Sequence, residues 1–223
     1  MMRRLPCIGS LILLASSFAL VLSSCAHVEK DRMLPADLEQ QWQKQTGLLS
    51  TINEWQLSGR ISVKNNQQSW QGGLRWYQHD TAFEISFSGF LGQQAAKLVG
   101  DSSGVKLIRP KEADLFSSDV SALLGEHFGW SIPVEGLRYW ILGLPDPGVK
   151  RESMLLNAMG LLASLEQAGW VVRFEKYQRV DDIYLPRKIK MTHARINIRV
   201  LMDEWSLQQS VKELMKAVPK ENG

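Results

Sequence analysis

The sequence predicts a mainly β protein with a few helices (α+β), built around one antiparallel sheet that a helical segment interrupts. Apolar and polar residues alternate with a period of two from Trp55 onward, and turn signals such as Asn65-Asn66 separate the alternating stretches. A segment of roughly thirty residues near the middle has helical spacing instead. Short strands joined by tight turns are typical of an antiparallel meander with one apolar face. A chain of 223 residues fits one such domain with an appendage.

The N-terminus predicts a targeting signal rather than part of the fold. Arg3 and Arg4 precede an apolar stretch and small residues, the arrangement of a secretory signal peptide, expected here over residues 1–24. The sequence LSSC at residues 22–25 resembles a bacterial lipobox, so Cys25 is expected to carry diacylglycerol and an N-acyl chain. Each buried acyl CH₂ contributes about 0.8 kcal/mol, and several chains together anchor stably. A plain secretory peptide with a chance cysteine is the alternative.

The cysteine count and the net charge further restrict the class of protein. Cys7 leaves with the signal and Cys25 is modified, so the mature domain is expected to depend on its core without a disulfide. Removing Arg3 and Arg4 from the 26 Lys+Arg leaves 24 against 23 Asp+Glu, a net charge of +1. This balance does not favour nucleic acid as a partner. Ala26, rather than an aspartate, follows Cys25, and in diderm bacteria this favours the outer membrane over the inner one.

Two segments lead into the sheet. Residues 25–36 are polar and aperiodic, and predict a tether between the lipid and the domain, which is expected over residues 37–205. From residue 37, Leu38, Trp42 and Leu49 fall near helical spacing, with Asp37 as a candidate N-cap, so a short helix is predicted.

Strands are then predicted over 55–64, 70–77, 83–88, 95–100 and 105–110, and later over 161–165, 170–175, 185–191 and 196–202. A curved sheet of this kind encloses either a packed core or an apolar cavity on its concave face. In the first three strands the alternation places these side chains on one face: Trp55, Leu57, Ile61, Val63, Leu74, Trp76, Phe83, Ile85 and Phe87.

The helical insertion is expected over about residues 113–144. One helix begins after Ser118 or Asp119, and a second fits residues 133–142 with Pro133 near its first turn. The two apolar stripes, which could cap a cavity, contain Leu123, Leu124, Phe128, Leu137, Trp140 and Ile141. Residues 206–223 predict a C-terminal helix, with Ser206 and Gln209 at capping-box spacing.

No catalytic or metal-binding pattern stands out. The four histidines, His27, His79, His127 and His193, lack HExxH or CxxC partners, and GxSxG, P-loop and GxGxxG motifs are absent. A solvated turn explains Asp181-Asp182 better than catalysis does, so we expect no enzyme and no cofactor. The late strands are basic, which favours a solvated face over a nucleic-acid surface, with weak attraction to anionic lipid headgroups as a further alternative. These basic residues are Arg187, Lys188, Lys190, Arg195 and Arg199.

One turn carries two large apolar side chains. Phe90 and Leu91 stand between Gly89 and Gly92, and an exposed apolar tip is a liability in a free soluble protein. On a protein tethered to a membrane it can enter the bilayer. Folding back onto the core is the alternative.

Residues 137–145, LRYWILGLP, follow a predicted helix and resemble the signature region of the LolB family of outer-membrane lipoprotein receptors. SGFLG at 88–92 resembles that family's exposed apolar loop, with Leu91 at the protruding leucine, and RINIRVLMDEW at 195–205 matches in order. The resemblance covers about residues 22–205. The predicted helix over 206–223 is longer than we expect for the family.

This resemblance implies a half-open antiparallel β-barrel that encloses an apolar cavity under a helical lid. The cavity would be lined by the nine apolar residues of the first three strands, and the lid would carry the six residues of the two helical stripes. It further implies a monomer, anchored in the outer membrane through Cys25 and facing the periplasm. Such a receptor accepts acylated lipoproteins from a LolA-type periplasmic carrier and passes them to outer-membrane phospholipid, without catalysis or cofactor. A structural or assembly lipoprotein that binds a protein or peptide on its sheet is the alternative, and a hydrolase would need a nucleophile and base that the sequence does not offer.

Overall fold

The computed structural model describes residues 35–89, 91–128 and 133–207. The predicted signal peptide, Cys25, Phe90 and residues 208–223 lie outside the described residues, as does all but the end of the tether. The elements in chain order are α1 (Pro35–Leu49), β1 (Glu54–Lys64), β2 (Ser69–His79), β3 (Ala82–Ser88), β4 (Gln94–Asp101), β5 (Gly104–Ile108), β6 (Leu115–Ser117), α2 (Val120–Phe128), α3 (Val134–Leu142), β7 (Arg151–Leu156), β8 (Leu162–Gln167), β9 (Trp170–Val180), β10 (Ile183–His193) and β11 (Ile196–Leu207).

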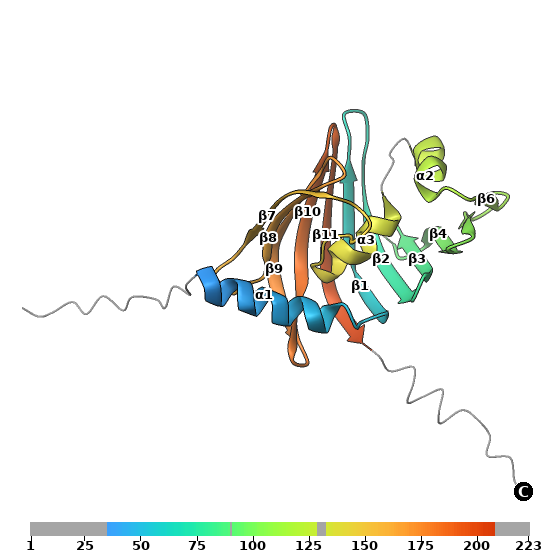
Figure 1. Cartoon of the computed structure of the whole chain (residues 1–223). Helices are drawn as coiled ribbons and strands as arrows, with labels where there is room; N and C mark the ends of the chain where they lie inside the picture. The colour runs from blue at the N-terminus through green and yellow to red at the C-terminus, as the bar shows by residue number, and fades with distance from the viewer. Residues whose placement is uncertain (1–34, 90, 129–132, 208–223) are drawn as a thin grey trace, which may run out of the picture. The chain divides into compact units, whose positions relative to one another are not determined.

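The described strands form one antiparallel sheet in the order β6-β5-β4-β3-β2-β1-β11-β10-β9-β8-β7. The chain starts in the middle of this sheet and meanders out to β6. It then passes through α2 and α3 to the opposite end, where β7 begins a second meander that returns to pair β11 with β1. Because the connection from β6 to β7 joins the two ends of the sheet, α3 crosses the sheet instead of lying at one edge (Figure 1). The fold class is therefore the predicted one: mainly β, open and barrel-like, with a helical insertion.

Local chemistry explains the helix ends. The Asp119 carboxylate accepts a hydrogen bond from the Ala122 N–H at 2.9 Å, so Asp119, one of the two predicted caps, begins α2. Gly143 ends α3 in the left-handed conformation with φ 82°, which glycine adopts without a Cβ clash. The prediction that Asp37 caps α1 is wrong, because that helix begins at Pro35, a residue favoured in the first turn, where no N–H is needed.

The strand prediction missed the two end strands and made three others too short: β9 runs to Val180, β10 from Ile183 to His193, and β11 to Leu207. β6 has only three residues, and β7 begins with exposed charged residues, so neither shows clear alternation. β11 runs on to Leu207, and Ser206 pairs with Gln56 of β1, so the predicted C-terminal helix does not begin at Ser206.

The core is one apolar cluster that all three helices and both meanders share. Trp42 and Leu49 of α1 are buried in it. Trp55 stands between two other indoles, with ring centroids 5.2 Å from Trp76 and 5.5 Å from Trp205. Offset and edge-on pairs of this kind add about 0.5–1.5 kcal/mol to the burial of each ring. These tryptophans therefore hold the sheet together where its two meanders meet.

Candidate functional site

An apolar hollow lies between the sheet and the two lid helices, α2 and α3. Only hydrophobic side chains line it, and they come from six strands and both helices. Strands β4 and β10 lie five places apart in the sheet and still share this hollow, so the sheet curves around it. The lining residues are Ile61, Leu74, Trp76, Ile85, Phe87, Leu98, Leu124, Val134, Leu137, Ile141, Met191, Ile198 and Val200.

Five of the nine side chains predicted to line a cavity do line this hollow: Ile61, Leu74, Trp76, Ile85 and Phe87. The other four do not. Trp55, Leu57 and Val63 are buried in the packed cluster, and Phe83 lines two other hollows. The alternation identifies the inward face correctly, but only part of that face lies under the lid helices.

The lid prediction divides in the same way. Leu124, Leu137 and Ile141 line the hollow, whereas Leu123 and Trp140 are buried against other parts of the core. The side chain of Phe128 lies outside the described residues. Sequence reasoning missed Leu98, Val134, Met191, Ile198 and Val200. Four of these continue the same alternation in strands that were predicted, but the alternation does not show which of those strands border the hollow.

The hollow is small, with a volume of about 40 Å³. A single water needs roughly 10–15 Å³ of such volume, and pockets for small molecules typically have about 300–1,000 Å³. The expected cavity is thus largely filled, because Leu124, Leu137 and Ile141 project into the concave face. A volume of this size is too small for a hydrocarbon chain while these side chains occupy it.

The turn between β3 and β4 is the second feature. Its ends are tied by hydrogen bonds from the Gly89 N–H to the Gln93 carbonyl and from the Gly92 N–H to the Gly89 carbonyl, both 2.9 Å. Gly92 has φ 79°, a conformation that favours glycine. Leu91 at the tip is 85% exposed, so it does not fold back onto the core.

The family model described as "Outer membrane lipoprotein LolB" matches residues 53–205, which include the sheet, the lid helices and the Leu91 turn. The chain belongs to the LolB family.

Two LolB relatives show how far the similarity extends. The chain is 39% identical to the outer-membrane lipoprotein LolB of Nitrosococcus oceani over 172 residues, which cover 77% of this chain and 86% of the relative. It is 32% identical to the LolB of Pseudomonas aeruginosa over 199 residues, which cover 89% of this chain and 97% of the relative.

Among solved structures, a LolA superfamily protein from Nitrosomonas europaea superposes with a TM-score of 0.50 at 7% identity, covering 82% of this chain and 97% of that one. A DUF1329 family protein from Desulfovibrio piger gives 0.51 at 8% identity, with 78% and 93% covered. At these identities the two structures support the fold alone.

In this LolB family member a buried glutamine attaches the end of α3 to the sheet. Gln167, at the end of β8, is fully buried, and its amide bonds four groups around the end of α3. Its Nε2 donates to the carbonyls of Asp146 at 2.8 Å and Val149 at 2.6 Å, and its Oε1 accepts from the Trp140 indole N–H at 3.0 Å and the Asp146 N–H at 2.9 Å. The C-terminal end of α3 is therefore fixed to the sheet. α2 packs against the core through Leu123 and Leu124.

Tyr177 of β9 supports the same region. Its hydroxyl donates to the Leu162 carbonyl at 2.8 Å, and it lies close to Gly143 at the end of α3. Burial raises the pKa of the Tyr177 phenol well above its ordinary value of 10. The tyrosine therefore stays protonated and keeps its hydrogen bond throughout the physiological pH range.

Replacing Gln167 with leucine is expected to lower the free energy of unfolding by about 3 kcal/mol, because the buried Trp140 indole N–H and three part-buried backbone groups lose their partner. Urea unfolding followed by tryptophan fluorescence measures the change. Glu166→Ala is the matched control, since its exposed side chain precedes Gln167 on the same strand and its loss should cost less than about 0.5 kcal/mol. A loss below about 1 kcal/mol for Gln167→Leu would show that the anchor is unimportant.

The candidate polar residues have ordinary structural roles. His193 stacks on Trp170 with ring centroids 5.0 Å apart, and Asp182 accepts from Arg179 at 2.9 Å in the turn after β9. Across the parts of the chain that the structure describes, no three His, Cys, Asp or Glu side chains gather where they could hold a metal ion. Among the described helices, none combines the length and apolar character needed to cross a bilayer.

Proposed function

We propose that this chain is an outer-membrane receptor, anchored through Cys25 and facing the periplasm, that accepts acylated lipoproteins from a LolA-type carrier and inserts them into the membrane. The observation that carries the proposal is the interior under the lid helices, which only apolar side chains line. Apolar burial is non-directional, so such a surface can bind acyl chains whatever protein they are attached to. Membership of the LolB family supports the same function.

The small volume of the hollow suggests how binding begins. An acyl chain that replaces the side chains of α2 buries its own CH₂ groups, each worth about 0.8 kcal/mol, against the same strand residues. Leu124 then becomes the displaced group, while α3 stays attached through Gln167. We therefore propose that α2 moves and α3 remains on the sheet. Because lid and cargo compete for one surface, the receptor holds cargo weakly enough to release it to a bilayer.

No bond is made or broken in this scheme. The receptor supplies a surface, and the free-energy gradient from carrier to bilayer supplies direction. The proposed activity is therefore binding and transfer, with no catalytic group and no cofactor.

The test compares a fluorescent acylated peptide with the same peptide lacking its acyl chains. The Cys25→Ala protein is used, so that the receptor's own lipid cannot occupy the site. We expect saturable binding of the acylated peptide only, with a change in tryptophan fluorescence because Trp76 lines the hollow. Equal binding of both peptides would contradict the proposal and would favour a scaffold that binds protein on its sheet.

A further inference from the structure

A second hollow lies on the outer face of the sheet, directly beside the Leu91 turn. It has a volume of about 620 Å³, and we call it the basic groove. Glycine and serine residues form one side of it, and Arg60, Lys188 and Arg199 form the other. Its lining residues are Arg60, Ile61, Ser62, Gln71, Gly72, Gly73, Ser88, Gly89, Gly92, Lys188, Arg199, Val200 and Leu201.

Close packing keeps side chains out of the groove. A Cβ at Gly73 would clash with the Ser88 hydroxyl oxygen on the neighbouring strand β3. A larger residue at Gly73 would therefore have to displace Ser88. The small residues leave open the space between the turn and the cations.

The cations beside the groove differ in whether a carboxylate forms an ion pair with them. The Arg60 Nη2 lies 3.0 Å from the Asp203 carboxylate, and the Lys188 Nζ lies 2.6 Å from that of Glu175. Lys190, in contrast, stands directly opposite Arg199 on β11 and Arg173 on β9. Within the described part of the chain no ion pair joins any of these three.

Like charges directly opposite one another destabilise a sheet. Glu175 lies two residues from Arg173 on β9, on the same face of the sheet as the row of Arg173, Lys190 and Arg199. The hydrogen bond from Lys188 is the main reason that the pKa of the Glu175 carboxyl lies below its ordinary value, with smaller contributions from Lys190 and Arg199. The Glu175 carboxylate thus interacts with several cations and cannot neutralise them all. The row of Arg173, Lys190 and Arg199 keeps a positive charge that an external anion could neutralise.

The position of this charge suggests the anion. Gly89 and Gly92, which flank the exposed Leu91, line the basic groove together with Arg199, so the groove connects the Leu91 turn to the unpaired cations that begin at Arg199. At a membrane surface an apolar side chain enters the acyl region while basic side chains attract the phosphates above it. The net charge of the mature chain is too small to supply such attraction without a local cluster.

We propose that the basic groove binds the headgroup phosphate of an anionic phospholipid when the Leu91 turn enters the bilayer. This inference rests on the proposed delivery to membranes and adds to it a lipid class and an orientation. Leu91 alone would allow the molecule to rotate about its tip. A second contact on the outer face fixes the angle at which the lid helices meet the membrane.

The test measures binding of Cys25→Ala protein to vesicles of phosphatidylcholine, with and without added phosphatidylglycerol. The double variant Lys190→Gln/Arg199→Gln should bind the anionic vesicles about thirtyfold more weakly, because each basic residue near the surface contributes about fivefold. Its binding to pure phosphatidylcholine should be unchanged. Its melting temperature should be equal or higher, because opposed like charges have been removed.

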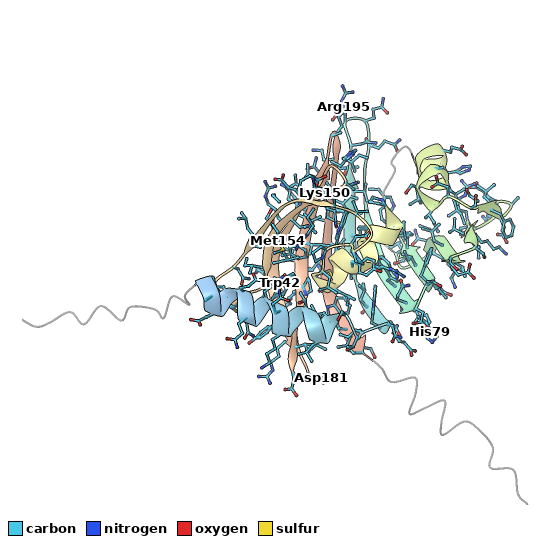
Figure 2. All side chains as sticks on the ribbon, viewed as in Figure 1. Trp42, His79, Lys150, Met154, Asp181 and Arg195 are labelled. Carbon is cyan, nitrogen blue, oxygen red and sulfur yellow. The ribbon has the colours of Figure 1, made fainter. Side chains whose placement is uncertain are left out.

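The matched control is Lys44→Gln/Arg179→Gln, which removes the same net charge from exposed positions. Lys44 lies on α1, and Arg179 lies beside the Asp181 turn, at the opposite end of the strands from the hairpin that carries Arg195 (Figure 2). The control should bind anionic vesicles as the parent does. The proposal is overturned if the control loses as much binding as the groove variant, or if the groove variant loses none. It is also overturned if the groove variant is impaired only in accepting cargo from an acidic carrier protein.

Uptake of acylated peptide separates this inference from the proposed function. Both double variants should take up the peptide normally, because no groove cation lines the apolar hollow. Normal uptake with unchanged vesicle binding would end the groove proposal and leave the receptor proposal intact. Absent uptake in the parent protein would count against the receptor itself.

Discussion

Leu91→Glu is expected to slow delivery of bound cargo to vesicles by about ten- to a hundredfold while leaving cargo uptake unchanged. Burying a leucine contributes about 1.5–3 kcal/mol, and each 1.4 kcal/mol corresponds to a factor of ten. Glutamate removes this contribution and adds a carboxylate that resists dehydration. Because Leu91 is 85% exposed, the substitution should not affect the free energy of unfolding. Transfer of a fluorescent acylated peptide from receptor to vesicles gives the rate.

Gln93→Glu is the matched control for this experiment. It introduces the same charge into the same turn, at an exposed position, and removes no apolar side chain. Its transfer rate should stay close to that of the parent on uncharged vesicles. Wild-type transfer by Leu91→Glu would show that the tip does not enter the membrane. Equal slowing by both variants would assign the effect to charge rather than to the leucine.

The alternation in the sequence was enough to predict the antiparallel sheet, its inward face and the helices that cover it. It could not show which of the inward positions reach the hollow and which are packed in the core. Trp55 and Ile61 both point inward on β1, but Trp55 is enclosed by Trp76 and Trp205, and only Ile61 reaches the hollow. Strand alternation reports the side of a sheet and contains no information on what packs over each position.

Long-range pairing explains the residues that were missed. Val200 lies opposite Ile61 because β11 pairs with β1, although well over a hundred residues separate the two strands in the chain. Local patterns do not reveal which distant strands pair, so the contribution of β10 and β11 to the hollow emerges only in three dimensions. The role of Gln167 is equally non-local, since a lone glutamine in a strand gives no sign of bonding a helix end. Nor does periodicity indicate whether a concave face is empty or filled.

The largest loss of function is expected from a charge inside the hollow. Ile85→Asp should abolish uptake of acylated peptide, because Ile85 lines the hollow and is only 3% exposed. A carboxylate there either stays ionised and excludes hydrocarbon or becomes protonated at a cost of several kcal/mol. Both outcomes remove the advantage of an acyl chain over the lid side chains that it displaces. Fluorescence titration with the acylated peptide measures the loss.

The control is the next residue. Ser86 points to the outer face of β3, opposite Arg75, so Ser86→Asp adds the same charge one position along without entering the hollow. It should bind acylated peptide as the parent does. Circular dichroism tests whether each variant is folded. If Ile85→Asp does not fold, Ile85→Asn provides an uncharged polar substitute. A folded Ile85 variant that takes up peptide normally would mean that acyl chains bind elsewhere. The apolar surface under α2 and α3 would then be core alone, and α2 would have no reason to move.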